Sequence, residues 1–223
     1  MITLHHLNNS RSQRVLWLLE EIGVDYKIKF YERDAKTMLA PESLKKVHPL
    51  GKSPVITDGK TTMAESGAII EYLAEKYGEG QLTPARDGQN YPRYRYWMHY
   101  AEGSAMPPLL LKLVFDQLTG PNMPLIMKPA AGLISYGVKK KFIDPQISLH
   151  LQFMESELAD RNWFAGGTFS AADIQMSFPL EAAQARGCLD EKHPALQNFL
   201  ARIHKRAAYQ RALEKGGEYE LLG

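Results

Sequence analysis

The segment from His48 to Tyr77 holds residues whose types and spacing fit the binding of a small acidic peptide. Ser53-Pro54 enters a strand, and a cis bond there turns the backbone N–H and C=O of Ser53 outward, where an extended peptide can pair with them. Glu65 and Ser66 start a helix, where free N–H groups and the helix dipole attract a carboxylate, while the Glu65 carboxylate can bind an ammonium group. The segment therefore predicts a site for an α-amino acid head followed by a peptide backbone, as in a γ-glutamyl peptide.

The elements that must position these residues alternate between strand and helix over residues 1 to about 77. Hydrophobic spacing predicts strands at Ile2 to His6 and Tyr26 to Tyr31, joined by a helix from about Arg11 to Ile22, and hence a parallel βαβ unit. The turn signal Asp58-Gly59 predicts a hairpin. The remaining expected elements are a short helix at 41–47, hairpin strands at 55–57 and 60–63, and a helix at 66–77. This is a thioredoxin-like arrangement.

Residues 78–88, GEGQLTPARDG, are rich in glycine and turn-forming residues and indicate a linker between two domains. Beyond it the strand signals disappear, so residues 89–223 predict an all-helical second domain and the chain as a whole an α+β protein. The expected helices span about 89–118, 124–142, 145–161 with Asp144 as N-cap, 171–186 and 194–207.

A capping box near residue 170 completes a set of four spaced features. Ser170 and Asp173 stand three residues apart at a helix start, flanked by Phe169 and Ile174 as an expected hydrophobic staple. The other three features are the strand, polar turn and helix of residues 2–21, the Ser53-Pro54 step and the Glu65-Ser66 pair. In this order and spacing the chain resembles the soluble, cytosolic glutathione S-transferase family, of bacterial or fungal type, over nearly its whole length.

The resemblance implies that a residue at the end of the first strand activates the thiol of glutathione, which is the co-substrate. Ser10 holds that position, although a serine there is also an ordinary N-cap. Asn9 is the second candidate because an amide N–H can also hold a thiolate, and Asn8 and Ser12 compete with both. Arg14 is expected to support the turn or to contact a carboxylate at the edge of the site.

The resemblance also places the rest of glutathione and the second substrate. The expected glutathione-binding residues are Lys52, Ser53, Pro54, Glu65 and Ser66, with Lys52 meeting the glycine carboxylate. The aromatic and arginine-rich segment at 91–108 could stack nucleic-acid bases, but its helical spacing favours a buried domain face or an apolar pocket wall. In the family this helix borders the electrophile site, so Tyr100, Ser104 and Met106 are the candidates for that pocket.

Composition limits the partners. The 223 residues carry a net charge of +2, without a basic tail or acidic run that would favour nucleic acid or an anionic membrane. The absence of a long apolar run or a signal-like start predicts a cytoplasmic protein. The single cysteine, Cys188, forms no intrachain disulfide and is interpreted as a packing residue, and the seven histidines lack metal-ligand spacing, so no metal is expected.

The predicted function is glutathione transfer, in which the glutathione thiolate attacks a small electrophile or a peroxide. The resemblance also implies a homodimer. Two alternatives remain open: a glutathione-dependent peroxidase or disulfide reductase, and a non-catalytic binding module with this fold. The Glu65-Ser66 pair and Ser53-Pro54 count against the module, because a pure scaffold has no need of them. The sequence does not identify the electrophile.

Overall fold

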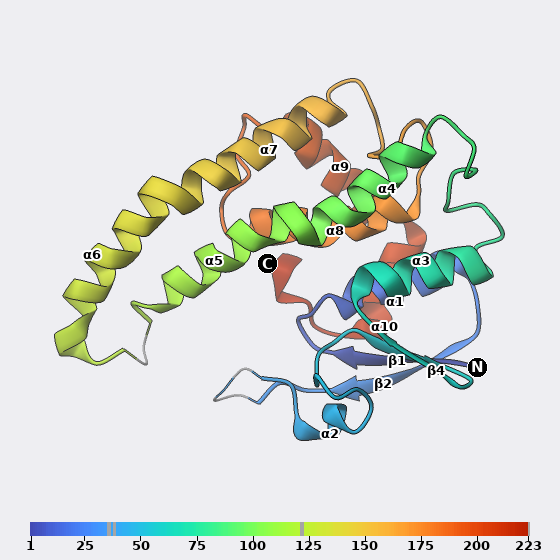
Figure 1. The fold of residues 1–223 in the computed structure, drawn as a ribbon, viewed down its shortest axis with the longest axis horizontal. Coiled ribbons are helices and arrows are strands. Elements are labelled where there is room, and N and C mark those ends of the chain that lie inside the picture. The colour runs from blue at the N-terminus through green and yellow to red at the C-terminus, as the bar shows by residue number, and fades with distance from the viewer. Residues whose placement is uncertain (35–36, 38, 121–122, 223) are drawn as a thin grey trace.

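A four-stranded sheet begins the protein, as the computed structural model of residues 1–34, 37, 39–120 and 123–222 shows (Figure 1). The strands lie in the order β2-β1-β3-β4, with β1 parallel to β2, and with β3 antiparallel to both β1 and β4. Their bounds are β1 Ile2–Leu7, β2 Tyr26–Tyr31, β3 Val55–Asp58 and β4 Thr61–Ala64. The βαβ unit and the hairpin across Asp58-Gly59 are both confirmed.

Three helices accompany the sheet: α1 Ser12–Ile22, α2 Glu42–Lys45 and α3 Ser66–Tyr77. All but the last two residues of α1 are buried, because the helix packs against β1 and α3 on one side and against helices of the second domain on the other. A helix that is covered all round is the central element of a core, and α1 is therefore held rigidly at both ends. Gly23 ends it in the left-handed conformation at φ 74°.

The second domain opens with one long rod. It consists of α4 Tyr91–Tyr100, a π-helical turn η1 at Ala101–Ala105, and α5 Met106–Gln117. The single helix expected at 89–118 is thus confirmed in extent but changes register in its middle. Pro107 and Pro108 lack the N–H groups that would bond the carbonyls of residues 103 and 104, and the wider π turn accommodates this gap.

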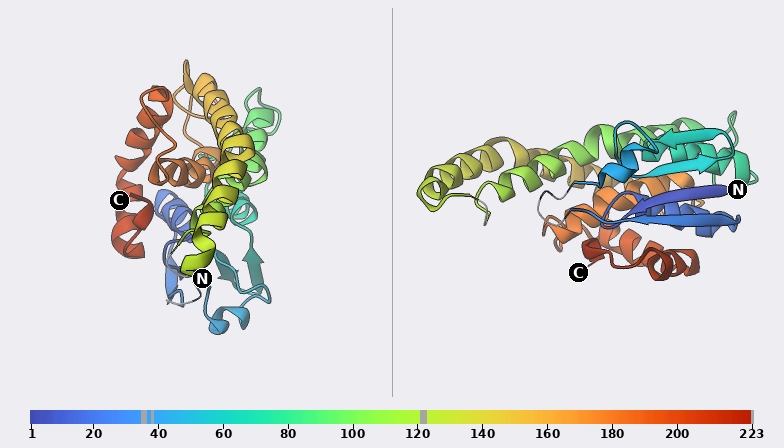
Figure 2. Two further views of the ribbon diagram at one scale, coloured as in Figure 1. Left: turned by 90° about the vertical axis from the view of Figure 1, so that its left-hand side faces the viewer. Right: turned by 90° about the horizontal axis from the view of Figure 1, so that it is seen from below.

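A second rod runs beside the first. It comprises a 3-10 turn at Leu125–Met127 (η2), α6 Lys128–Val138, a π-helical turn η3 at Lys139–Ile143 and α7 Asp144–Leu158. Asp144 was expected to cap a separate helix, which is wrong: Ile143 before it is already helical, so the chain continues into α7 without a break. The α5 and α6 parts extend away from the body of the molecule (Figures 1 and 2). Within the described part of the chain, no helix is sufficiently long and apolar to cross a membrane.

The remaining helices are α8 Ala171–Ala185, α9 Pro194–His204, α10 Ala207–Gly216 and the 3-10 turn η4 Glu220–Leu222. The capping box at α8 is confirmed, since the Asp173 carboxylate accepts the Ser170 N–H at 2.8 Å. The helix expected at 194–207 ends at His204, and α10 was not expected. Although α10 belongs to the second domain in sequence, it packs on α1, so the end of the chain covers the first domain.

Candidate functional site

The turn between β1 and α1 carries Ser10, the first candidate for thiol activation. Its hydroxyl donates to the Leu7 carbonyl at 2.8 Å and accepts the Ser12 N–H at 3.2 Å. The Ser10 carbonyl accepts the Gln13 N–H at 3.2 Å. Ser10 therefore takes up the N–H of Ser12, the first residue of α1, which resembles the capping role that the sequence also allowed, although the N-cap position itself falls on Arg11.

A buried relay next to Ser10 was not predicted. The His6 Nε2 lies 3.1 Å from the Gly216 carbonyl, which only accepts, so the ring hydrogen sits on Nε2 and Nδ1 accepts from the Ser12 hydroxyl at 2.9 Å. Burial lowers the pKa of His6 to about 4, which keeps the ring neutral. The Ser12 oxygen, 2.8 Å from Ser10 Oγ, is then an acceptor. The Ser10 hydroxyl hydrogen therefore has two protein acceptors at 2.8 Å, the Leu7 carbonyl and the Ser12 hydroxyl.

Asn9, the second candidate, has a different hydrogen-bond environment. Its backbone is left-handed at φ 49°, a conformation that asparagine tolerates. The Asn9 Oδ1 accepts the Glu220 N–H at 2.9 Å, so the amide nitrogen must face the other way. No hydrogen bond among the described residues occupies that nitrogen. Asn8 is engaged, since its Oδ1 accepts the Arg33 N–H at 3.0 Å.

Ser53 lies beside this turn. Its peptide bond to Pro54 is cis, as expected. The Ser53 hydroxyl donates to the His5 carbonyl at 3.2 Å and lies 3.4 Å from the Ser10 hydroxyl. The predicted thiol-activating turn and the predicted peptide-pairing strand entry are therefore neighbours. Lys52 is exposed and forms no hydrogen bond or ion pair within the described ranges.

The start of α3 has the geometry expected of a carboxylate site. Glu65 precedes the helix with φ 70° and ψ 114°, and its carbonyl accepts the Ile69 N–H at 2.9 Å. Among the described residues no partner binds the Glu65 carboxylate, which leaves it able to meet an ammonium group. Ser66 is buried, and its hydroxyl accepts a hydrogen bond from Arg14 at 2.5 Å. Arg14 thus supports the site from inside the protein.

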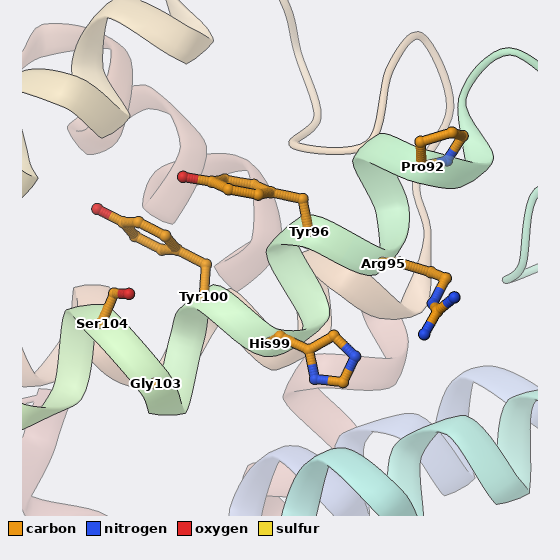
Figure 3. A pocket seen from close by; sticks show the side chains of 7 residues that line it. All are labelled: Pro92, Arg95, Tyr96, His99, Tyr100, Gly103 and Ser104. Carbon is orange, nitrogen blue, oxygen red and sulfur yellow. The ribbon is translucent and has the colours of Figure 1, made fainter.

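Tyr100 and Ser104 share an open pocket of about 620 Å³ on the α4 rod (Figure 3). The Tyr100 hydroxyl lies 2.5 Å from Nδ1 of His150 on α7, and burial raises the tyrosine pKa above its usual range. Tyr96 and Tyr100 project on one side of α4, and Arg95 and His99 on the other. The full lining is Pro92, Arg95, Tyr96, His99, Tyr100, Gly103 and Ser104. Met106 does not line this pocket, because its side chain is buried in the core.

One turn connects this pocket with the expected glutathione site. The π-helical turn η1 contributes Gly103 and Ser104 to the pocket, and its Glu102 carboxylate binds Arg11 at 3.1 Å and also binds Arg14. Arg11 and Glu102 were not predicted, because they lie about 90 residues apart in the sequence and no local pattern marks their pairing.

The described residues give little support to metal binding or to catalysis by the protein's own cysteine. They contain no group of three or more His, Cys, Asp or Glu side chains placed to hold a metal ion, so the metal-free site stays a prediction. Cys188 lies half-buried after α8, where burial raises the pKa of its thiol. A thiol with a raised pKa is a poor nucleophile, which agrees with its interpretation as a packing residue.

Family models, related sequences and solved structures that are similar to this chain include many glutathione S-transferases. The N-terminal domain model of glutathione S-transferase matches residues 1–75, and the C-terminal domain model matches residues 125–207. Glutathione S-transferase 3 of Schizosaccharomyces pombe is 38% identical, covering 96% of this chain and 88% of its own. The disulfide-bond oxidoreductase YfcG of Escherichia coli is 26% identical, covering 96% and 95%. A crystal structure of a glutathione S-transferase from Actinobacillus pleuropneumoniae has a TM-score of 0.83 and 34% identity, covering 100% and 96%.

Proposed function

The chain belongs to the glutathione S-transferase family, and we propose that it binds glutathione between the Ser53 strand entry and the start of α3 and activates its thiol. The observation that carries this proposal is the 3.4 Å approach of the Ser10 and Ser53 hydroxyls. It brings the turn that would hold the sulfur next to the backbone that would pair with the cysteinyl part of the peptide. A ligand that spans both places has its sulfur at the N-terminus of α1.

The γ-glutamyl head is the part of glutathione that the start of α3 would recognise. The α-carboxylate meets the free N–H groups and positive dipole end of α3 together with the Ser66 hydroxyl, and the α-ammonium meets Glu65. The Ser53 backbone pairs with the cysteinyl residue. Lys52, which is exposed beside this strand, meets the glycine carboxylate.

Thiol activation is the chemical step that the β1–α1 turn would perform. The thiol gives its proton to water, and the dipole of α1 together with an N–H or O–H donor stabilises the resulting thiolate. The thiolate then attacks an electrophilic carbon, a C–S bond forms and the leaving group departs. The free amide nitrogen supports Asn9 as this donor, with Ser10 as the alternative. The electrophile would lie in the Tyr100 and Ser104 pocket, which Met106 does not reach.

Reduction of a disulfide or a peroxide is the second candidate function. The similarity to the E. coli disulfide-bond oxidoreductase favours it, because the same bound thiolate can attack sulfur or oxygen instead of carbon. A first glutathione would attack the disulfide and release one thiolate, and a second glutathione would resolve the mixed disulfide and release oxidised glutathione. The protein's own cysteine is not needed for this sequence.

Calorimetry on two variants tests the glutathione site. We expect Glu65→Gln and Ser66→Ala each to weaken glutathione binding about 10- to 150-fold, because a hydrogen bond to a charged group contributes about 1.5–3 kcal/mol. Glu214→Gln on the exposed side of α10 is the matched control and should bind normally. Unchanged affinity in both site variants would remove the assignment.

An activity panel then separates the candidate reactions. Aryl halides, epoxides, hydroperoxides and small disulfides are each supplied with glutathione. Turnover of a halide or an epoxide supports transfer, whereas turnover of only hydroperoxides or disulfides supports the reductase. Tight glutathione binding without any turnover would favour the binding module.

We further propose a cytoplasmic homodimer. Apolar side chains exposed on η2 and α6 support a subunit contact, since Leu125 and Ile126 of η2 are 82% and 90% exposed and Leu133 of α6 is 74% exposed. Monomeric proteins rarely expose large contiguous apolar patches. Sedimentation equilibrium measures the subunit number directly, and a monomer at micromolar concentration would refute the proposal.

A further inference from the structure

Arg14 is a buried cation that joins three parts of the chain. It lies on α1, and its side chain is 1% exposed. Its guanidinium donates to the Ser66 hydroxyl at 2.5 Å, to the Gln175 carbonyl on α8 at 2.6 Å and to the Glu102 carboxylate on η1. Because the three acceptors come from both domains, the position of the guanidinium is fixed by the whole fold.

The direction of the bond to Ser66 follows from the chemistry of arginine. A guanidinium has only donors, so the Ser66 oxygen must accept in this contact. The hydroxyl hydrogen must then point away from Arg14. Within the described residues no acceptor takes that hydrogen. Arg14 therefore holds Ser66 with its hydroxyl hydrogen available as a donor, which is the orientation that a ligand carboxylate requires.

Glu102 holds Arg14 in turn. The Glu102 carboxylate also accepts from Arg11 Nε at 3.1 Å, so it lies between two guanidinium groups. Burial opposes its ionisation, but the attraction of Arg14 and Arg11 prevails and lowers its pKa. The cluster of Arg11, Arg14 and Glu102 thus carries a net charge of +1. Glu102 reduces the local positive charge while fixing where Arg14 points.

We propose that Arg14 is a positioning residue, which Glu102 holds in place and which orients the Ser66 hydroxyl toward the α-carboxylate of the γ-glutamyl group. This inference rests on the proposed function, because it assumes glutathione at the start of α3. The Arg14–Glu102 pair then connects that site to η1, the turn that also lines the neighbouring pocket.

The test compares glutathione with an analogue that lacks the α-carboxylate, 4-aminobutanoyl-cysteinylglycine. The measured quantity is the ratio of the two dissociation constants by calorimetry, and we expect the wild type to prefer glutathione about 10- to 150-fold. Ser66→Ala and Arg14→Lys should each reduce this preference about fivefold or more, because lysine keeps the charge but cannot reach three acceptors together. Arg14→Lys in the Ser66→Ala background should have little further effect, since both act through one hydroxyl.

Glu102→Gln separates positioning from simple attraction and replaces Arg14→Lys if that variant does not fold. Removing the carboxylate raises the cluster charge from +1 to +2, so attraction alone would strengthen the preference for glutathione. Positioning predicts a weaker preference, because Arg14 loses the group that holds it. Arg206→Lys, which alters the Arg206 fork onto Glu21 at 2.6 and 2.9 Å, is the matched control and should leave the preference unchanged.

The outcomes keep the two proposals apart. Failure of the wild type to bind glutathione would refute the glutathione site itself. Equal binding of both peptides by the wild type would refute carboxylate recognition at the start of α3, and with it the role of Arg14. A normal wild-type preference with full additivity of Arg14→Lys and Ser66→Ala would overturn the role of Arg14 alone. A stronger preference in Glu102→Gln would also overturn it.

Discussion

Replacing Asn9 and Ser10 separately is expected to change the pKa of the bound glutathione thiol by different amounts. The Asn9 amide nitrogen is unoccupied among the described residues, so its loss forfeits a whole hydrogen bond to the thiolate, about 1.5–3 kcal/mol. At about 1.36 kcal/mol per pKa unit, the thiol pKa should rise by about 1 to 2. The Ser10 hydroxyl must first leave the Leu7 carbonyl at 2.8 Å, which costs about 0.5–1.5 kcal/mol. At the middle of these ranges, Ser10→Ala forfeits about 1.3 kcal/mol and should raise the thiol pKa by about 1, against about 1.7 for loss of the Asn9 amide.

The assay is the ultraviolet absorbance of the thiolate in the binary complex, titrated with pH, together with the pH profile of kcat/KM. Asn9→Gly is the suitable variant, because glycine accepts φ 49° without strain. It also removes the Oδ1 that accepts the exposed Glu220 N–H, a bond that does not involve the thiolate. Asn198→Ala on the exposed side of α9 is the control. A larger rise in Ser10→Ala than in Asn9→Gly would refute the hydrogen-bond reasoning and return the role to Ser10. No rise in either would show that the turn does not hold the thiolate.

Two further predictions concern stability. The pKa of His6 falls from its ordinary 6.5 to about 4 in the fold, so the unfolded chain takes up a proton first as pH decreases. The free energy of unfolding should therefore drop by about 3 kcal/mol between pH 7 and pH 4 through this group. Urea titrations at several pH values give this free energy, and in His6→Asn it should fall less steeply with pH than in the wild type. An equal fall in both proteins would contradict the prediction. Gly216→Ala should destabilise by about 1–3 kcal/mol, because its Cβ would lie 2.4 Å from Gln13 Oε1 and 3.0 Å from Leu16 Cδ2. Gly137→Ala on α6, where a Cβ meets nothing within 4 Å, should instead raise the melting temperature, and equal changes in the two variants would sink the packing argument.

Turns and helix starts could be predicted from the sequence wherever adjacent residues determine them. The capping box of Ser170 and Asp173 and the turn at Asp58-Gly59 depend on a few adjacent side chains, and both are confirmed. The π-helical turn before Pro107 escaped prediction, because a proline inside a helical pattern is equally compatible with a break, a kink or a wider turn. The same ambiguity before Pro145 made Asp144 look like a cap.

Long-range contacts were beyond the sequence pattern. The spacing of Glu65 and Ser66 predicted a helix start, but Arg14 becomes their neighbour only when α1 packs against α3 and α8. His6 and Ser12 form a relay only because α10 returns to cover the first strand, which brings the Gly216 carbonyl to the His6 ring. The close approach of Gly216 to α1 is what the absence of a side chain permits there. The residues next to His6 in the sequence do not indicate that it contacts a residue 210 positions later.

The backbone of Glu65 has a consequence for laboratory evolution. At φ 70° and ψ 114° a residue with a Cβ is strained, at a cost of order 1–3 kcal/mol. Glycine has no Cβ and tolerates positive φ at a lower cost, so Glu65→Gly reduces the strain while removing the carboxylate proposed to hold the ammonium group. A selection for heat resistance alone would therefore enrich inactive descendants at this position. Libraries that aim at a more durable enzyme should hold Glu65 fixed, or should couple survival to turnover.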